Sequence, residues 1–259
     1  LIQPDTFMTL PSCSSSASRT TYTFGMALIG ACEKLRDSIL KCASENFGLT
    51  DSTEPVLEPG GIATRDGRHF SFQELFNAMP DERKTCVHYF EAPTASEVLT
   101  NNENLRMHGL PHEIFSFAAH AVFIEIDKLT GVLSLKKYLA VSDCGAVLNP
   151  QIYEQQVQGA IAQGIGYAMM ENYSCEQSGR YPDGFADYLI PTACDVPKVD
   201  CVALDLFEPT GPFGLKGLGE ISTGGPLPAV SNAVCDACGV RILSYPITAE
   251  KIYRAIKPV

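Results

Sequence analysis

Two alternating apolar runs joined by a short turn, and followed at once by a helical pattern, restrict most strongly how this chain can fold. The runs FSFAAHAVFIEID and VLSLKKYLAVSDCG flank the turn KLTG, which ends in Gly131. This arrangement predicts an antiparallel hairpin over residues 115–145. Asn149 and Pro150 then suit the cap and first position of a long helix that runs to MMENY. We therefore expect an α+β fold with mixed sheets and long helices.

The helix expected after Asn149 has small residues along one face, namely Gly159, Ala160, Gly164 and Ala168. Glycine costs about 1 kcal/mol relative to alanine inside a helix. We therefore expect another backbone or a ligand to come close to this face. Gln156, Gln158 and Gln163 on the same helix could hydrogen-bond a planar heterocycle, or they could simply be solvated.

Residues 211–226, GPFGLKGLGEISTGGP, combine many glycines with a single carboxylate, Glu220. Glycine permits close backbone approach but is costly to order, so such a stretch usually serves a purpose. A phosphate-binding P-loop requires Ser or Thr after Gly-Lys, and here Lys216 is followed by Gly217. A carboxylate partly withdrawn from water can hold or release a proton near neutrality, which makes Glu220 a candidate general base.

The N-terminal segment LPSCSSSASRTTYTFG is rich in Ser and Thr and leads into a helical pattern that stops at Gly48. Hydroxyls at the start of a helix can hold an anion, or they can act as an ordinary N-cap. Further along, EPGGIATRDGRHFSFQELF predicts a short strand, a turn at Asp66-Gly67 and a short helix. We also expect strands over TCVHYFEAP and Val199–Phe207, a helix from Pro226 to Gly239, and a last helix capped by Thr248.

Charge and composition exclude several classes of protein. The net charge is −11 at pH 7, and Lys and Arg are not clustered, so we expect no nucleic-acid partner. We expect no membrane span either, because no apolar run reaches the roughly 18 residues that one requires. The histidines, at positions 88, 108, 112 and 120 among others, lack the spacing of a helical metal-ligand pair.

The ten cysteines are scattered, as buried free thiols are, which leaves a metal or redox role open only for the CxxC pair Cys235 and Cys238. Reduced thiols and an N-terminus unlike a signal peptide favour a cytoplasmic location. The first residue is not Met, so a longer chain is expected to have been trimmed or cut.

Three segments in order resemble the molybdenum hydroxylases, the xanthine dehydrogenase and aldehyde oxidoreductase family. GLKGLGEISTGGPLPAVSNAVCDACGVRILSYPITAEKIYRAI resembles the C-terminal end of that family, including its K-G-x-G-E motif. VFIEIDKLTGVLSLKKYLAVSDCGAVLNPQIYEQQVQGAIAQGIGYAMME is similar to the preceding hairpin and helix, and SSSASRTTYTFGMALIGAC resembles the family's cofactor-binding polar loop. The resemblance spans nearly residues 12–256, although residues 49–111 match weakly.

The resemblance implies a molybdopterin-binding domain of the xanthine dehydrogenase type, with a first lobe over residues 1–110 and a second over 111–259, divided near Leu110. It implies that Glu220 is the general base that activates the attacking oxygen, and that Gly219 lets its loop come close to the molybdenum site. The pterin and its phosphates would be bound by Gln156 and by the segment Ala17, Ser18, Arg19, Thr20 and Thr21.

The family's large subunit is much longer and has, upstream, a Gly-Gln-Gly and a Gly-Gly-x-Phe segment that this sequence lacks. The chain is therefore expected to hold half of a molybdenum site, as in a divided subunit of the nicotinate dehydrogenase type or a cut fragment. A companion molybdopterin subunit or N-terminal half would hold the rest. The resemblance implies that FAD and 2Fe-2S clusters lie on partner subunits, and the lack of an iron–sulfur cysteine spacing in this sequence agrees with that division. The cofactor form implied is the cytosine dinucleotide.

The function implied is oxidation of a small-molecule substrate, an N-heterocycle or an aldehyde, with water as the oxygen source. A non-catalytic or degenerate assembly protein with the same fold is the main alternative, and Glu220 argues against it. A free-standing anion-binding enzyme is disfavoured because no basic cluster matches the Ser/Thr loop.

Overall fold

A computed structural model describes residues 5–12, 14–49, 53–92, 99–101, 106–108, 114–175 and 179–257. Contacts divide the chain into two compact units, one of Leu1–Thr21 with Glu113–Val259, the other of Tyr22–His112. The segment up to Thr21 thus belongs to the same unit as Glu220. Leu110, the expected boundary, lies outside the described residues, and the lobes 1–110 and 111–259 stay a prediction. We describe each unit by itself.

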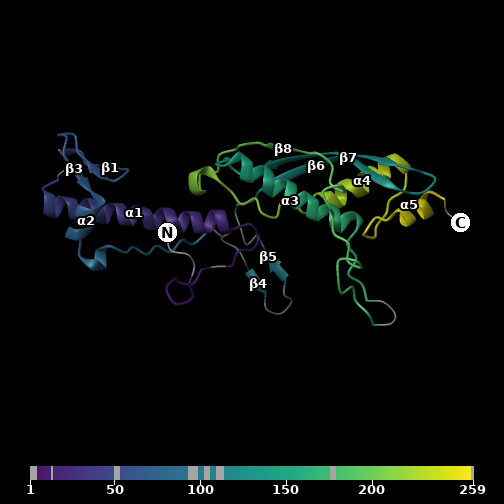
Figure 1. The fold of residues 1–259 in the computed structure, drawn as a ribbon, viewed down its shortest axis with the longest axis horizontal. Coiled ribbons are helices and arrows are strands. Elements are labelled where there is room, and N and C mark those ends of the chain that lie inside the picture. Colours follow the sequence, from purple (N-terminus) through teal and green to yellow (C-terminus); the bar gives the residue numbers. More distant parts are fainter. Residues whose placement is uncertain are drawn as a thin grey trace. The chain divides into compact units, whose positions relative to one another are not determined.

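The first unit is built on a three-stranded mixed sheet (Figure 1). β6 (Phe117–Ile126) pairs antiparallel with β7 (Leu133–Asp143), and β8 (Val199–Ala203) adds parallel to β7. The predicted hairpin is therefore confirmed. Its turn is closed by Asp127, whose carboxylate accepts hydrogen bonds from Leu129 N and Thr130 Oγ1.

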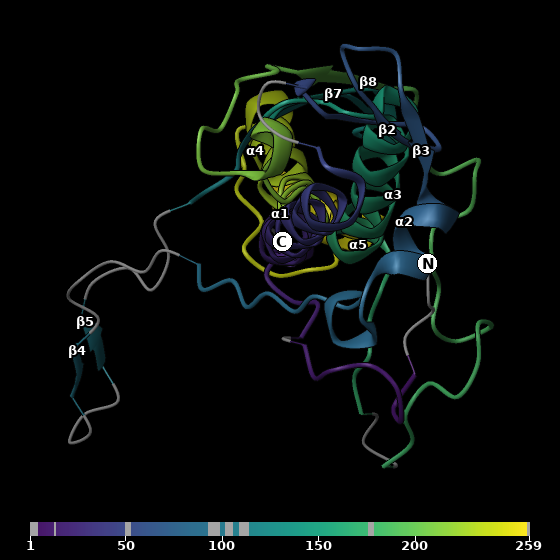
Figure 2. The same cartoon turned by 90° about the vertical axis from the view of Figure 1, so that its left-hand side faces the viewer.

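Helices cover one face of this sheet. α3 (Pro150–Met169) begins where predicted, because Asn149 Oδ1 accepts from Ile152 N and Pro150 occupies the first turn. α4 (Pro226–Cys238) ends at left-handed Gly239, and α5 (Ala249–Ile256) is capped by Thr248. Figures 1 and 2 both show α3 and α4 on the same side of the strands. A short 3-10 turn, η3 (Pro212–Gly214), lies in the glycine-rich stretch.

The core of the first unit lies between the sheet and these helices. Beneath β7, residues of α3 pack against the strand in a cluster that includes Tyr138, Ala140, Tyr153, Val157, Ile161 and Ile165. A neighbouring cluster joins α4, α5 and the far end of the hairpin through Val230, Val234, Ile247 and Ile252. Alternate residues of β7 are buried, as expected for a sheet with one covered face.

The α3 face that carries small residues allows close packing at Gly164. A side chain at Gly164 would collide with the Thr223 carbonyl and with Pro226, so the start of α4 can approach α3 only because residue 164 is glycine. A Cβ at Gly159, by contrast, would meet no atom within 4 Å. The expected close approach is thus confirmed at Gly164 and absent at Gly159 among the described residues.

In the second unit, the C-terminal half of α1 (Thr20–Phe47) packs against a small antiparallel sheet and a short helix. Its further elements are β1 (Val56–Glu58), β2 (Gly61–Ala63), β3 (His69–Ser71), α2 (Phe72–Ala78), η2 (Asp81–Arg83), β4 (Leu99–Asn101) and β5 (Arg106–His108). The predicted strand, turn and helix at residues 58–76 are confirmed. A capping box formed by Ser71 and Glu74 starts α2.

The strand predicted over TCVHYFEAP is wrong for residues 85–92, which carry no strand pairing; Pro93 lies outside the described residues. This segment instead packs along α1. The His88 ring fills the space that the missing side chain of Gly30 leaves, Lys34 Nζ donates to the Val87 carbonyl at 3.0 Å, and Phe90 meets Tyr22 edge-on. Alternate side chains of residues 85–92 are therefore partly buried because the segment contacts a helix, and not because it pairs in a sheet.

The described cysteines, Cys235 and Cys238 included, are all free; Cys13 lies outside the described residues. In the part of the chain that the structure describes, no three His, Cys, Asp or Glu residues gather as they would around a metal ion. His112 and the His108 side chain are not among the described groups. Among the described helices, none combines the length and apolarity needed to span a membrane.

Candidate functional site

The glycine-rich stretch is fixed to the sheet by a buried ion pair at Lys216. Lys216 Nζ lies 2.6 Å from Asp143 Oδ2, and the two side chains are only 8% and 12% exposed. The ammonium also donates to the Phe115 carbonyl at 2.9 Å and lies over the Phe117 ring. Burial alone would raise the pKa of the Asp143 carboxyl, but hydrogen bonds from Lys216 and from the Gly145 amide hold this pKa below its usual range.

Backbone hydrogen bonds continue this attachment on both sides of Lys216. Lys216 N donates to the Cys144 carbonyl at 2.8 Å, and Ala146 N donates to the Gly214 carbonyl at 2.7 Å. Ser116 Oγ donates to the Gly217 carbonyl at 2.6 Å. The segment leading to Glu220 is therefore held against the ends of β6 and β7.

Glu220 itself is exposed and is held by one residue from the N-terminal segment, Ser18. Ser18 Oγ accepts a hydrogen bond from Glu220 N at 2.9 Å and donates one to Glu220 Oε2 at 3.1 Å. A single hydroxyl thus contacts both the backbone and the carboxylate of the same residue. Sequence reasoning placed Ser18 and Glu220 in one site, and the structure brings them into contact.

Two features of the backbone allow this contact. A side chain at Gly217 would collide with the Ser18 carbonyl, whereas a Cβ at Gly219 would meet Ser18 Oγ at an ordinary 3.7 Å. Ala17 and Ser18 both adopt left-handed backbone angles, with φ of 54° and 55°. Such angles are unfavourable for residues other than glycine and are often found at functional sites.

The remaining residues expected from the N-terminal segment surround this turn. Ala17, Thr20 and Thr21 are exposed, and Thr20 is the first residue of α1. Arg19 folds back on its own loop, because its guanidinium donates to the Ser16 carbonyl and to Ser16 Oγ at 2.9 and 2.8 Å. The segment therefore presents hydroxyls to its surroundings at the start of α1.

Gln156 is not gathered into this cluster. Its side chain is exposed on α3, and it shares no hydrogen bond with Ser18 or Glu220 in the described chain. Its expected contact with the pterin remains a prediction.

His120 is a residue that the sequence did not single out for this region. Its ring lies against Gly225, at the end of the glycine-rich stretch, and its Nδ1 is 2.9 Å from the Tyr138 hydroxyl. Burial lowers the pKa of His120 and raises that of Tyr138. Among the described side chains, His120 Nε2 and Ser222 Oγ are buried without a hydrogen-bond partner. His120 and Ser222 are far apart in the sequence, so no sequence pattern links them.

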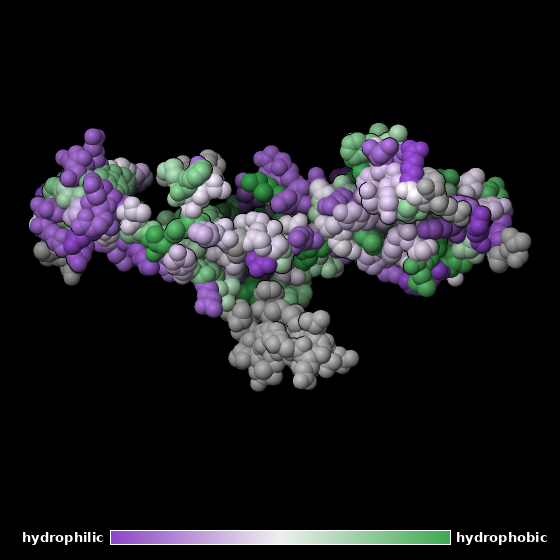
Figure 3. All heavy atoms as spheres, turned by 90° about the horizontal axis from the view of Figure 1, so that it is seen from below, coloured by the Kyte–Doolittle hydropathy of each residue, from purple (hydrophilic) through white to green (hydrophobic). Residues whose placement is uncertain are grey.

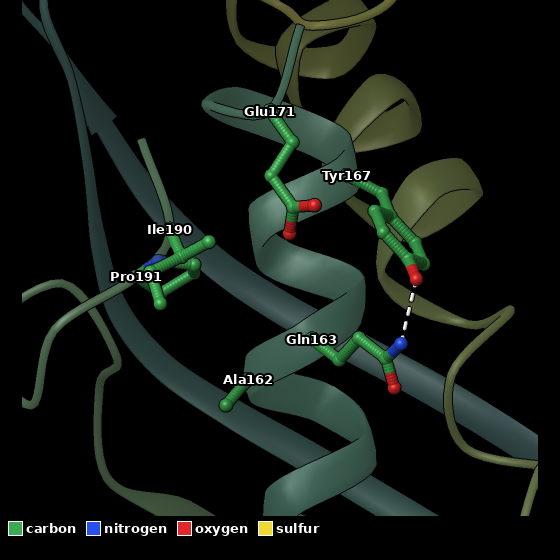
Figure 4. Close-up of a pocket in the computed structure, with 6 residues that line it drawn as sticks. All are labelled: Ala162, Gln163, Tyr167, Glu171, Ile190 and Pro191. Carbon is green, nitrogen blue, oxygen red and sulfur yellow. Dashed lines mark hydrogen bonds between the residues drawn. The ribbon is translucent and has the colours of Figure 1, made fainter. Parts of the chain in front are cut away.

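A cavity of about 320 Å³ lies elsewhere on the first unit, at the C-terminal half of α3 (Figure 4). Its lining residues are Ala162, Gln163, Tyr167, Glu171, Ile190 and Pro191. Gln163 Nε2 donates to the Tyr167 hydroxyl at 2.6 Å, and Glu171 accepts a hydrogen bond from Tyr188. Of the residues that the sequence offered for ligand binding, Gln163 lines this cavity, whereas Glu220, Gly219, Gln156 and residues 17–21 do not.

Comparison with known proteins identifies the family. The family model of the molybdopterin cofactor-binding domain matches residues 1–197, which is most of the chain. The chain belongs to this molybdopterin cofactor-binding domain family. The match contains the Ser18 turn, the hairpin and α3.

A relative that matches nearly the whole chain extends the similarity across the Glu220 stretch. A probable xanthine dehydrogenase subunit of Bacillus subtilis (strain 168) is 32% identical over 257 residues, covering 97% of this chain and 32% of that protein. The aldehyde oxidoreductase molybdenum-binding subunit PaoC of Escherichia coli (strain K12) is 35% identical over 164 residues, 61% of this chain and 22% of that protein.

A solved structure shows the same fold. Quinoline 2-oxidoreductase from Pseudomonas putida 86 superposes with a TM-score of 0.72 at 26% identity, covering 94% of this chain and 31% of its own. The molybdopterin-binding fold expected from the sequence is thereby confirmed. This chain spans about a third or less of the length of these relatives.

The residues of the site fit a molybdopterin cofactor. The N-terminal turn offers exposed hydroxyls at the start of a helix, which suit the oxygen-rich phosphates of such a group. Beside that turn, Glu220 and Gly219 are exposed, so the described part of this chain does not bury the carboxylate. The turn and Glu220 belong to one unit and are joined by hydrogen bonds.

Proposed function

We propose that this chain forms the base-bearing half of the molybdenum site in a hydroxylase that oxidises an N-heterocycle or an aldehyde. The observation that carries the proposal is the contact of Glu220 with Ser18, because it joins an exposed carboxylate to the turn expected to bind the cofactor. Relatives named as xanthine dehydrogenase, aldehyde oxidoreductase and quinoline oxidoreductase proteins support this substrate range.

In this proposal each residue of the chain has a distinct task. Glu220 accepts the proton of the oxygen that attacks an electron-poor carbon of the substrate, with water as the ultimate oxygen source. Ala17, Ser18, Arg19, Thr20, Thr21 and Gln156 hold the pterin and its phosphates. When bound, the molybdenum cofactor supplies a Lewis acid and accepts two electrons. Gly219 leaves room for the group beside Glu220.

The proposal also includes partners. The chain covers a minor part of each relative, and two of these relatives are named as subunits. A companion molybdopterin subunit or N-terminal part would complete the site, and further subunits would carry FAD and 2Fe-2S clusters. Exposed apolar side chains on and after β8 suit such a partner, namely Val202, Leu204, Leu206, Phe207 and Phe213. Figure 3 shows apolar patches interspersed among hydrophilic residues.

The finer features proposed are the cytosine dinucleotide form of the cofactor and a cytoplasmic location. The free state of the described cysteines supports the location. The cofactor form can be read directly from the nucleotide released when the purified complex is acid-treated.

The experiment that tests the function is elemental mass spectrometry of the chain, tagged in its host and purified gently with its partners. About one molybdenum per chain supports the hydroxylase. An intact complex without molybdenum would instead support the alternative, a non-catalytic assembly protein.

A variant then tests the role of the carboxylate. Glu220→Gln is expected to abolish turnover while the molybdenum content stays unchanged, because the amide cannot accept the proton. Glu125→Gln, at an exposed carboxylate on β6 that pairs with Lys136, is the control and should keep full kcat. Full activity in the Glu220→Gln enzyme would refute the general-base assignment.

A further inference from the structure

Ser18 has a role toward Glu220 that differs from cofactor binding. Its hydroxyl accepts from the Glu220 amide and donates to the Glu220 carboxylate, across 202 positions of sequence. The first contact fixes the backbone at residue 220, and the second selects one direction for the side chain. From this double contact we propose that Ser18 is a positioning residue, which holds the catalytic carboxylate in its reactive orientation. The proposal rests on the proposed function of Glu220.

The surrounding chain explains why such a residue is needed. Lys216 and its hydrogen bonds fix the stretch up to Gly217, and the Leu218 side chain packs against the core of the first unit. Beyond that point come Gly219, whose backbone is intrinsically free, and then the exposed Glu220. Glu220 N and its carboxylate have Ser18 as their hydrogen-bond partner in the described chain. Without Ser18, the carboxylate would sample several rotamers in water.

The geometry of the turn shows that the contact is built into the fold. Ser18 is held at φ 55°, next to Ala17 at φ 54°, and its carbonyl lies where a Gly217 side chain would otherwise be. A left-handed backbone conformation is unfavourable for serine. The residue that contacts Glu220 thus has an unfavourable backbone conformation, and only glycine at position 217 leaves room for the Ser18 carbonyl.

The Ser18 contact also explains why glycine occurs at position 217 of the glycine-rich stretch. Gly217 admits the Ser18 backbone directly, and Gly219 lies in ordinary contact with the Ser18 hydroxyl. At least one glycine of the motif therefore serves the approach of the N-terminal turn. Correct orientation of a proton acceptor has a large influence on rate, because misplacement by about 1 Å can cost a hundredfold.

The test uses Ser18→Ala in the complete, cofactor-loaded protein, with Ser134→Ala as the matched control at an exposed serine on β7. Hydrogen–deuterium exchange measures the amide of Glu220 without requiring activity. Because this amide loses its acceptor, peptides containing Glu220 should exchange about fivefold faster in Ser18→Ala. Ser134→Ala should leave their exchange unchanged.

The kinetic part of the test separates orientation from cofactor binding. Per bound molybdenum, Ser18→Ala should lower kcat about tenfold or more and leave KM nearly unchanged. Ser18→Gly removes the same hydroxyl but relieves the left-handed backbone, so it covers the case in which Ser18→Ala folds poorly. It should show the same loss of kcat.

Three results would overturn the proposal. Unchanged exchange at Glu220 in both variants would show that the hydroxyl does not hold this residue. Loss of molybdenum with normal kcat per remaining molybdenum would make Ser18 a cofactor ligand only. Full kcat per bound molybdenum in Ser18→Gly would show that the hydroxyl does not position Glu220 for catalysis. If Glu220→Gln keeps its activity, the proposed function fails, and the exchange measurement still decides whether Ser18 positions Glu220.

Discussion

Lys216 Nζ and Asp143 Oδ2 lie 2.6 Å apart in a nearly buried ion pair that joins the glycine-rich stretch to the end of β7. Besides bonding Asp143, Lys216 Nζ donates to the Phe115 carbonyl, and Lys216 N donates to the Cys144 carbonyl. The catalytic candidate Glu220 follows four residues later in the chain. The pair therefore anchors the stretch that carries Glu220 to the rigid sheet.

Lys216→Met should destabilise the protein by about 3 kcal/mol, because it leaves the Asp143 carboxylate buried without its cation. Lys136→Met is the matched control, since Lys136 pairs with Glu125 in an exposed ion pair; it should change stability by less than about 1 kcal/mol. Denaturant unfolding of both variants measures the difference. Equal stabilities would show that the buried pair does not anchor the stretch.

Gly217→Ala and Gly224→Ala should differ sharply although they lie in one loop. A methyl group at residue 217 meets the Ser18 carbonyl, whereas at residue 224 it meets no atom within 4 Å. We expect Gly217→Ala to lower the melting temperature and the molybdenum content, and Gly224→Ala to leave both close to wild type. Thermal unfolding and elemental analysis provide the measurement. If Gly217→Ala behaves like its control, Ser18 does not approach the stretch as described.

Alanine substitutions at two glycines of α3 form a second matched pair, with expected stability changes of opposite sign. Gly159→Ala should stabilise the protein by about 1 kcal/mol, because its surroundings are open and alanine favours the helix. Gly164→Ala should destabilise it, because the added methyl collides with the Thr223 carbonyl and Pro226. Unfolding midpoints of the two variants test this. Stabilisation by both would mean that α3 and α4 are not in close contact at Gly164.

His120 should make stability depend on pH below neutrality. Burial lowers its pKa in the folded protein, so between that value and the ordinary value of about 6.5 only the unfolded chain binds the proton. This contribution to stability is therefore complete above the ordinary value and is lost as the pH falls through it. The free energy of unfolding should drop as the pH falls below about 6.5, and less steeply in His120→Gln. An identical slope in the variant would contradict a buried neutral imidazole.

Elements whose chemistry is local could be predicted from the sequence. The turn before Gly131, the Asn149-Pro150 start of α3 and the Gly239 end of α4 each depend on residues within about one turn of one another. Family resemblance added Glu220 and the Ser18 segment as members of one site. The alternation in residues 85–92 misled because a segment packed along a helix and an edge strand bury side chains with the same period.

Which of these residues come into contact depends on tertiary packing. Ser18 and Glu220 are separated by 202 positions, and Lys216 and Asp143 by 73, so neither contact leaves a periodic or spacing signal in the sequence. The same holds for Gly159 and Gly164, which look alike in the helix pattern although only one of them faces a neighbouring backbone. Contacts of this kind arise when the sheet and helices pack, because packing, not local propensity, brings distant segments within hydrogen-bond distance.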